Sequence, residues 1–260
     1  MTDDFRSLHV PGVPLVLVNA WDAASARIVA AAGAPAVATT SAGVSWSLGV
    51  ADGDRLDRTA ALDVVRRVAA AVAVPVTADV ETGYGATPDA VADTVRAVVA
   101  AGAVGINIED VDPATGGLRD VADQCARLAA VRAAGGTLFV NARIDTVLRG
   151  LGGVDETVER ATAYLAAGAD GIFVPGVVDP DAIAELVERI AAPVNVMAGP
   201  GAPSVPELAK LGVARVSLGS AVAQAAYTVA RRAADEAYAA GTYGALDDAL
   251  DFGTLNALLS

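Results

Sequence analysis

The feature that most constrains the fold is a repeated alternation of short, β-branched runs with longer, alanine-rich runs from end to end of the chain. Each short run is nearly all apolar in its first half, which is typical of strands buried on both faces of a parallel sheet. The longer runs carry apolar residues at helical spacing, and alanine has a high helix propensity. Eight strands are predicted, at residues 15–20, 36–41, 76–81, 105–110, 138–143, 171–176, 194–199 and 215–220.

The junctions between these runs repeat as well. Ala-Ala-Gly-Ala precedes the second, fourth and sixth predicted strands, and a valine next to a proline leads into the first, third and seventh. Eight β/α units with alternating junctions predict an α/β fold of the (β/α)8 TIM-type barrel class. The alternative is an open doubly wound sheet, but NAWDAASA follows the first strand where a glycine-rich dinucleotide loop is typical. We expect the barrel over residues 1–243 and a C-terminal helical extension over 244–260.

Net charge, apolar runs and cysteine content narrow the expected partners and location of the protein. The net charge of −13 argues against nucleic acid or an anionic membrane as a partner. No run of 18 apolar residues is free of charge and glycine, and the N-terminal MTDDFRSLHV lacks the layout of a signal peptide. A single cysteine, Cys125, fits a reducing compartment. We expect a cytoplasmic protein whose partner is a small molecule.

Rare side chains narrow the chemistry further. His9 is the only histidine and Lys210 the only lysine, so a histidine metal site, a Ser-His-Asp triad or a Schiff-base lysine is not expected. We expect His9 to be a packing or surface residue and Cys125 to be buried and inert. Catalysis then depends on carboxylates, hydroxyls, arginine, backbone amides or a bound ion.

Three carboxylates lie at the ends of neighbouring predicted strands. Asp79 and Glu81 are two apart on the third strand, so the alternation of a strand predicts that both point the same way, and Glu109 holds the matching place on the fourth. Acids that converge at a barrel mouth repel one another unless a cation neutralises them, and all-oxygen ligands favour Mg²⁺, with Mn²⁺ as the other possibility. The alternative is that these acids cap helices or pair with arginine.

Other strand ends supply groups for a carboxylate substrate. Arg143 closes the fifth strand, where a guanidinium can hold a carboxylate at two points; its alternative role is a structural partner of Glu109 or Asp145. An insertion at residues 42–57 follows the second strand and is expected at the active face or an oligomer interface. The remaining predicted substrate contacts are Thr40, Ser41, the amides of Ala42 and Gly43, and Asn195.

The segments TTSAGVSWSLGVADGD, ADVETGYG, GINIEDVDP, NARIDTVLRG and GADGIFVPG together resemble the isocitrate lyase/phosphoenolpyruvate mutase superfamily. The resemblance implies a barrel that binds Mg²⁺ and an α-keto acid or enolate-forming carboxylate. It implies that Asp79 binds the metal directly, while Glu81, Glu109 and Asp52 contact it through water. It also implies a homodimer or homotetramer in which subunits exchange the eighth helix, a segment apolar enough to suit exchange.

One departure from the superfamily concerns the loop after the fourth strand. Lyases of this kind carry a Lys-Lys-Cys-Gly-His motif there, whereas VDPATGGLRDVADQ contains none of the three reactive residue types. We therefore predict an Mg²⁺-dependent lyase that cleaves a C–C bond of a small α-keto or α-hydroxy acid through an enolate-like intermediate. Arg143 orients the substrate, and Asp52 or water supplies the proton.

Two other functions remain open at this point. The first is a phosphonopyruvate or phosphoenolpyruvate mutase or hydrolase, favoured if Arg119 or another arginine enters the site. The second is an α-keto-acid-binding protein without catalysis.

Overall fold

The computed structural model describes residues 2–260 and confirms the parallel barrel. The strands are all parallel and follow the order β1-β9-β8-β7-β6-β5-β4-β3-β2, so from β2 to β9 neighbours in sequence are neighbours in the sheet. Their bounds are β1 Leu15–Leu17, β2 Asn19–Ala20, β3 Val37–Thr39, β4 Val76–Asp79, β5 Gly105–Glu109, β6 Phe139–Arg143, β7 Gly171–Val174, β8 Val194–Met197 and β9 Arg215–Ser217.

Nine strands appear where eight were predicted because the first predicted strand is divided. β1 pairs with β9 and β2 pairs with β3, so the two ends of the sheet are consecutive pieces of one segment. The chain itself thereby closes the barrel. Open doubly wound topology is excluded by this strand order.

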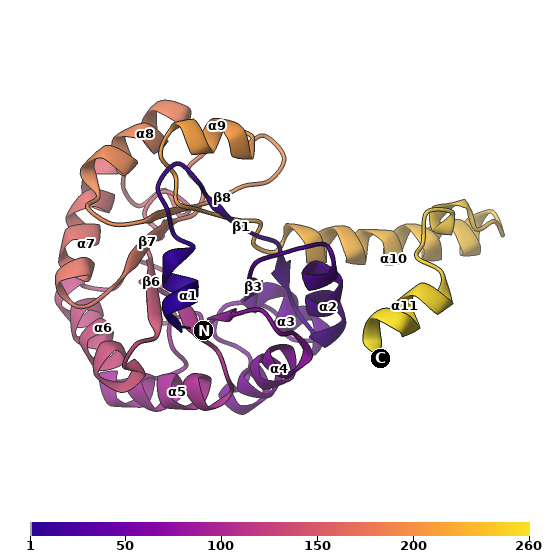
Figure 1. Ribbon diagram of the computed structural model, residues 1–260, viewed down its shortest axis with the longest axis horizontal. Helices are drawn as coiled ribbons and strands as arrows, with labels where there is room; N and C mark the ends of the chain where they lie inside the picture. Colours follow the sequence, from indigo (N-terminus) through magenta and orange to yellow (C-terminus); the bar gives the residue numbers. More distant parts are fainter. Residues whose placement is uncertain (1) are drawn as a thin grey trace.

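Helices surround the barrel as a ring (Figure 1). Their first turns are well specified by sequence: Thr87 and Asp179 cap helices that begin with proline, and each side chain accepts a bond from the backbone N–H three residues later. The helices that follow strands are α2 Ala23–Ala31, α3 Ser41–Ser47, α4 Arg58–Ala71, α5 Pro88–Ala100, α6 Val121–Gly135, α7 Val154–Ala166, α8 Pro180–Arg189, α9 Val205–Lys210 and α10 Ala221–Ala239.

A short N-terminal helix, α1 (Thr2–Ser7), lies across one end of the barrel (Figure 1). Its Phe5 is fully buried and meets Phe139 of β6 edge to face, with ring centroids 5.7 Å apart. His9 stacks on Phe139 at 4.0 Å and is buried, which confirms its packing role. The opposite end, where the strands finish, is left for the site.

The C-terminal part leaves the barrel. α10 projects away from it, and the chain then turns through η1 (Gly244–Leu246) into α11 (Phe252–Leu259), which runs back toward α2 (Figure 1). Arg27 of α2 donates to the Leu258 carbonyl at 3.2 Å. Within the described chain, no helix is both long and apolar enough to cross a membrane.

Candidate active site

Asp79 ends β4 and is tied to the first turn of α3. Its Oδ2 accepts from the Ser41 hydroxyl at 3.0 Å and from the Ser41 backbone N–H at 3.3 Å. The Asp79 backbone N–H donates to Thr39 Oγ1 at 2.9 Å. The carboxylate is partly exposed at the barrel mouth. Asp79 therefore lies at a strand end, as predicted, and its functional role stays a prediction.

Glu81 lies differently from the prediction. β4 ends at Asp79, and Glu81 follows in a turn with φ at +50°, so the two do not share one face of a strand. Strand alternation no longer applies once the backbone has left the extended conformation. The Glu81 carboxylate accepts from the backbone N–H groups of Gly53, at 3.1 Å, and Asp54, and from the Tyr84 hydroxyl at 2.9 Å.

Glu109 and Arg143 form an ion pair at the ends of β5 and β6. Glu109 Oε2 lies 2.9 Å from Arg143 Nη1. Arg143 Nε and Nη2 donate to the two carboxylate oxygens of Asp145, at 2.6 and 2.9 Å. The alternative role of Arg143, as a partner of both acids, is therefore present in the structure. A guanidinium has five N–H groups, so those not used by these acids are still free to hold a substrate.

A buried network supports Asp145. Its backbone N–H donates to Asp110 Oδ1 at 3.0 Å, and Asp110 Oδ2 accepts from the Tyr164 hydroxyl at 2.9 Å and faces Arg160 Nη1 at 3.3 Å. Asp110, Asp145 and Tyr164 are fully buried. The sequence did not predict that Tyr164 of α7 belongs to this network. Nothing in the α7 sequence indicates a contact with Asp110, which lies 54 residues earlier, just after β5.

The acids at the mouth interact electrostatically. Burial raises the pKa of Glu81 to about 7, and the nearby carboxylates of Asp54 and Asp79 add to it. Burial also raises the pKa of Glu109, opposed by the positive charge of Arg143. The pKa of Asp52 is raised by partial burial and then by Asp79, although much of the residue's surface is exposed. Arg143 is the cation that opposes the raised pKa of both Glu109 and Asp52.

This arrangement fits a divalent cation bound partly through water. The available donors are all oxygens, as Mg²⁺ prefers, and their mutual repulsion would be relieved by a positive ion. Within the described part of the chain, no group of three or more histidine, cysteine, aspartate and glutamate side chains is arranged to hold an ion by itself. The roles of Asp79, Glu81 and Glu109 as metal-binding residues stay a prediction, with Asp79 the most accessible direct ligand.

The other predicted substrate contacts are divided between two places. Thr40 precedes α3 without capping it through its side chain, and Ala42 and Gly43 lie in the first turn beside Ser41. A Cβ on Gly43 would lie 2.8 Å from Trp21 Cβ, so close helix packing already explains this glycine. Asn195 lies away from these residues: its amide pairs with Ser217 Oγ inside the barrel, at 3.2 Å.

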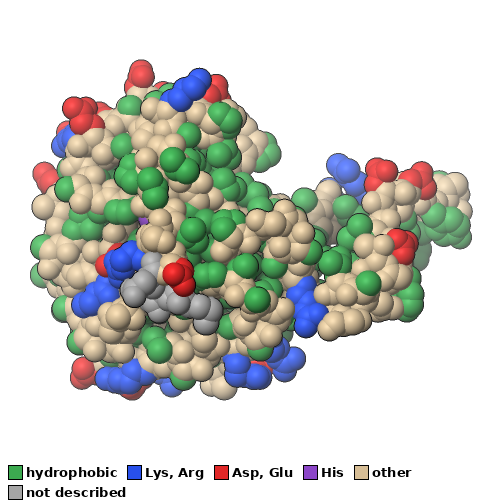
Figure 2. All heavy atoms as spheres, in the orientation of Figure 1, with side chains coloured by type: hydrophobic (Ala, Val, Ile, Leu, Met, Phe, Trp, Pro, Cys, Tyr) green, Lys and Arg blue, Asp and Glu red, His purple; other side chains and the backbone are tan. Residues whose placement is uncertain are grey.

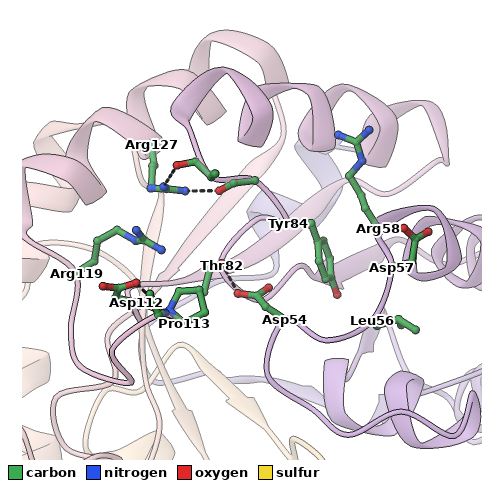
Figure 3. Close-up of a pocket in the computed structure, with 13 residues that line it drawn as sticks. Asp54, Leu56, Asp57, Arg58, Thr82, Tyr84, Asp112, Pro113, Arg119 and Arg127 are labelled. Carbon is green, nitrogen blue, oxygen red and sulfur yellow. Dashed lines mark hydrogen bonds between the residues drawn. The ribbon is translucent and has the colours of Figure 1, made fainter.

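A cavity of about 570 Å³ lies beside the turn after β4, and its lining residues do not include Asp79, Glu81 or Glu109 (Figure 3). Asp54, Thr82 and Tyr84 line one wall and Arg119, in the loop after β5, lines another. Arg119 donates to Asp123 at 3.1 Å and to the Val111 carbonyl at 3.3 Å.

The only cysteine, Cys125, lies on α6, and its sulfur is 3.6 Å from the Ala163 carbonyl. It is only partly buried, so the prediction that it is buried was wrong.

The fold and the acid-lined mouth define a parallel-barrel protein with its polar site at the carboxyl ends of the strands. A family model described as phosphoenolpyruvate phosphomutase matches residues 5–238, and the chain belongs to this family. The resemblance to the isocitrate lyase/phosphoenolpyruvate mutase superfamily is thereby confirmed. Enzymes of this superfamily carry out lyase and mutase chemistry on small acids.

Individual relatives cover most of the chain. An uncharacterised protein of Mycobacterium tuberculosis (strain ATCC 25618 / H37Rv) is 44% identical over 231 residues, covering 88% of this chain and 87% of its own length. A 2-methylisocitrate lyase of Escherichia coli (strain K12) is 32% identical over 202 residues, covering 69% of this chain and 65% of its own length. A solved structure of a putative lyase/mutase from Burkholderia cenocepacia J2315 is 40% identical, with a TM-score of 0.92 over 98% of this chain and 94% of that one.

A further solved structure bears on the metal. A phosphonopyruvate hydrolase in complex with oxalate and Mg²⁺ is 26% identical and has a TM-score of 0.86, covering 99% of this chain and 94% of that one. A divalent metal is therefore consistent with the family.

Proposed function

We propose that this protein is an Mg²⁺-dependent lyase that cleaves a C–C bond of a small α-keto or α-hydroxy carboxylic acid. The observation that carries the proposal is the group of acids, Asp52, Asp79, Glu81 and Glu109, gathered at the barrel mouth beside Arg143. Mn²⁺ is the alternative ion. When bound, the cation polarises the oxygens of the substrate and stabilises negative charge that develops on them.

Arg143 is the residue suited to hold the substrate carboxylate. Asp145 and Glu109 fix the guanidinium from two sides, so its orientation is set before the substrate arrives. Its unused N–H groups offer charge-assisted bonds to the carboxylate. The Ser41 hydroxyl already donates to Asp79, so the further donors suited to the substrate are the backbone N–H groups of Ala42 and Gly43 in the first turn of α3.

Proton transfer is assigned to Asp52 or to water. Cleavage of an α-hydroxy acid removes the hydroxyl proton, passes the C–C bond electrons to the carbon beside the second carboxylate, and returns a proton to that carbon. Asp52 lies near Asp79 and Ser41, and its raised pKa suits a group that both accepts and donates a proton. The described loop between β5 and α6, residues 110–120, contains no cysteine that could donate this proton.

The test is an assay of the purified protein with Mg²⁺ on oxaloacetate and on acids of the 2-methylcitrate type. We expect turnover that a chelator abolishes and that Asp79→Ala reduces strongly. Asp63→Ala is the matched control, because Asp63 lies exposed on α4 and pairs with Arg66 at 2.5 Å. Turnover that survives both the chelator and Asp79→Ala would overturn the proposal.

A second candidate is cleavage or rearrangement of a P–C bond. It is favoured by Arg119, which lines the cavity next to Asp54 and Thr82 and so supplies a cation beyond Arg143 for a phosphonate. Phosphorus NMR of phosphonopyruvate with the protein and Mg²⁺ distinguishes the two. Conversion of phosphonopyruvate without turnover of the C–C substrates selects the second candidate, and tight keto-acid binding without any turnover selects a non-catalytic binding protein.

We also propose a homodimer or homotetramer formed by exchange of α10, and a cytoplasmic location. The exchange is supported by the exposed apolar side chains on and after α10. The cytoplasmic location is supported by the single cysteine.

A further inference from the structure

Two facing segments at the barrel mouth hold unusual backbone conformations. Asp54, Glu81 and Tyr84 are the non-glycine residues with positive φ in the described chain, at +56°, +50° and +50°. A left-handed conformation is sterically unfavourable for a non-glycine residue. Such conformations persist only where surrounding interactions over-determine them. These three therefore point to a set of contacts between the 51–56 segment and the turn after β4.

The contacts are hydrogen bonds that converge on Glu81. Its carboxylate accepts from Gly53 N–H at 3.1 Å and from Asp54 N–H on one oxygen, and from the Tyr84 hydroxyl at 2.9 Å on the other. Thr82 donates in the opposite direction, from its hydroxyl to Asp54 Oδ2, as the dashed line in Figure 3 shows. Glu81 itself is 2% exposed, so water does not compete for these bonds.

The other contacts of the 51–56 segment lie at its two ends and at Asp52. Residues 51–53 are exposed, Leu56 is buried against Val44 and Ala61, and Val50, just before the segment, packs against the same cluster. The Asp52 side chain also has a hydrogen bond with Ser41. The segment therefore has an apolar contact at each end and the Glu81 carboxylate in its middle. Asp52 lies directly before the two backbone N–H groups that Glu81 holds.

We infer that Glu81 is a positioning residue, which fastens the 51–56 segment across the barrel mouth and thereby sets the place of the Asp52 carboxylate. The role of Asp52 in proton transfer rests on the proposed function, but the role of Glu81 in holding the 51–56 segment does not. A carboxylate has about four acceptor positions, of which three are occupied here by groups of the chain. Fastening is thus the main use of this side chain, and one position is left for a water molecule.

Hydrogen exchange of the Gly53 and Asp54 amides tests this inference, measured on the protein without metal or substrate. Glu81→Ala removes both acceptors, so we expect both amides to exchange at least about tenfold faster. Glu81→Gln keeps one carbonyl oxygen as an acceptor and should retain most of the protection. Tyr84→Phe removes one bond to Glu81 and should give a smaller increase in exchange.

The matched control is Tyr164→Phe, which removes a tyrosine bond of the same kind from Asp110, elsewhere in the barrel. It should leave exchange at Gly53 and Asp54 unchanged. Unchanged exchange in Glu81→Ala would overturn the inference, and so would equal loosening by Tyr84→Phe and Tyr164→Phe. If Glu81→Ala does not fold, the comparison of Glu81→Gln, Tyr84→Phe and the control decides. Because no substrate is present, failure here is distinct from failure of the lyase proposal.

Discussion

His9 shows what burial does to a single titratable residue. Its Nδ1 lies 3.0 Å from the Phe5 carbonyl, and its ring stacks on Phe139. Burial, followed by the positive charge of Arg215, lowers the pKa of His9 from 6.5 to about 4. Hydrogen bonds to the backbone of Phe5 and Arg6 act in the opposite direction and raise this pKa, but they do not outweigh burial. The histidine is therefore neutral in the folded protein at pH values where it is charged in the unfolded chain.

This difference predicts a loss of stability in acid. Between pH 6.5 and about 4 the unfolded chain binds a proton at His9 that the folded protein does not, so the free energy of unfolding falls as the pH falls. The shift corresponds to about 3 kcal/mol across this window. Urea unfolding of the wild type and His9→Gln at several pH values measures it. The variant should have a flatter pH dependence; parallel curves would contradict the assigned cause.

Arg143 depends on Asp145 for its orientation, and this predicts a binding defect. Asp145→Asn keeps the shape of the side chain but removes the charge that fixes the guanidinium through two bonds. We expect oxalate, as a mimic of the substrate carboxylate, to bind about tenfold more weakly or worse, by calorimetry with Mg²⁺ present. Asp170→Asn is the control, because Asp170 pairs with Arg6 at 2.6 Å outside the mouth. Equal oxalate affinity in Asp145→Asn and the wild type would argue against this role.

At the scale of elements, the strand interiors were predictable and their ends were not. Apolar runs marked the buried strands, because a parallel sheet covered on both faces needs apolar residues on both. The turn after β4 was not predictable, since Glu81 is not a residue type that signals a positive φ. Its conformation depends on the Gly53, Asp54 and Tyr84 contacts, which only the folded chain brings together.

α3 carries Ser41 to Asp79, and its close packing yields a prediction. In Gly43→Ala the added Cβ would lie 2.7 Å from Thr40 Cγ2 and 2.8 Å from Trp21 Cβ, so the helix must shift. Overpacking of this kind costs roughly 1–3 kcal/mol. The melting temperature should fall, and substrate binding should weaken as Ser41 moves. Gly153→Ala is the control, because a Cβ there meets open space. A Gly43→Ala protein as stable as the control would show that α3 packs less tightly.

At the scale of the whole molecule, the projecting C-terminal arm needs an explanation. Only Ala223 of α10 is buried, while Tyr227, Tyr238 and Phe252 on or beyond it are exposed. Figure 2 shows hydrophobic side chains on this arm. Apolar surface of this extent is typical of an interface with another chain.

The arm predicts the oligomeric state. If subunits exchange α10, light scattering should give two or four times the chain mass of 25.8 kDa. Tyr227→Glu, which places a charge on the apolar side of the helix, should shift the protein toward monomer. Asp235→Ala, an exposed change farther along α10, should not. A wild-type monomer at micromolar concentration would contradict the exchange.

The sequence also predicted most of the residues of the candidate site, but few of the hydrogen bonds that join them. Asp79, Glu109 and Arg143 were found because strand ends of a barrel meet at one face. The links from Arg143 through Asp145 and Asp110 to Tyr164 join segments that only the closed barrel brings into contact. The buried amide of Asn195 pairs with Ser217, a contact that its position along β8 does not reveal, and its role in substrate binding stays a prediction.

The measurement that tests the account most directly is a Mn²⁺ titration of the protein, followed by calorimetry or electron paramagnetic resonance. The wild type and Asp63→Asn should bind one ion at the barrel mouth, and Asp79→Asn should bind it more than about 100-fold more weakly, since Asp79 is the expected direct ligand. Equal affinity of Asp79→Asn and the wild type, or no binding by the wild type, would contradict the account.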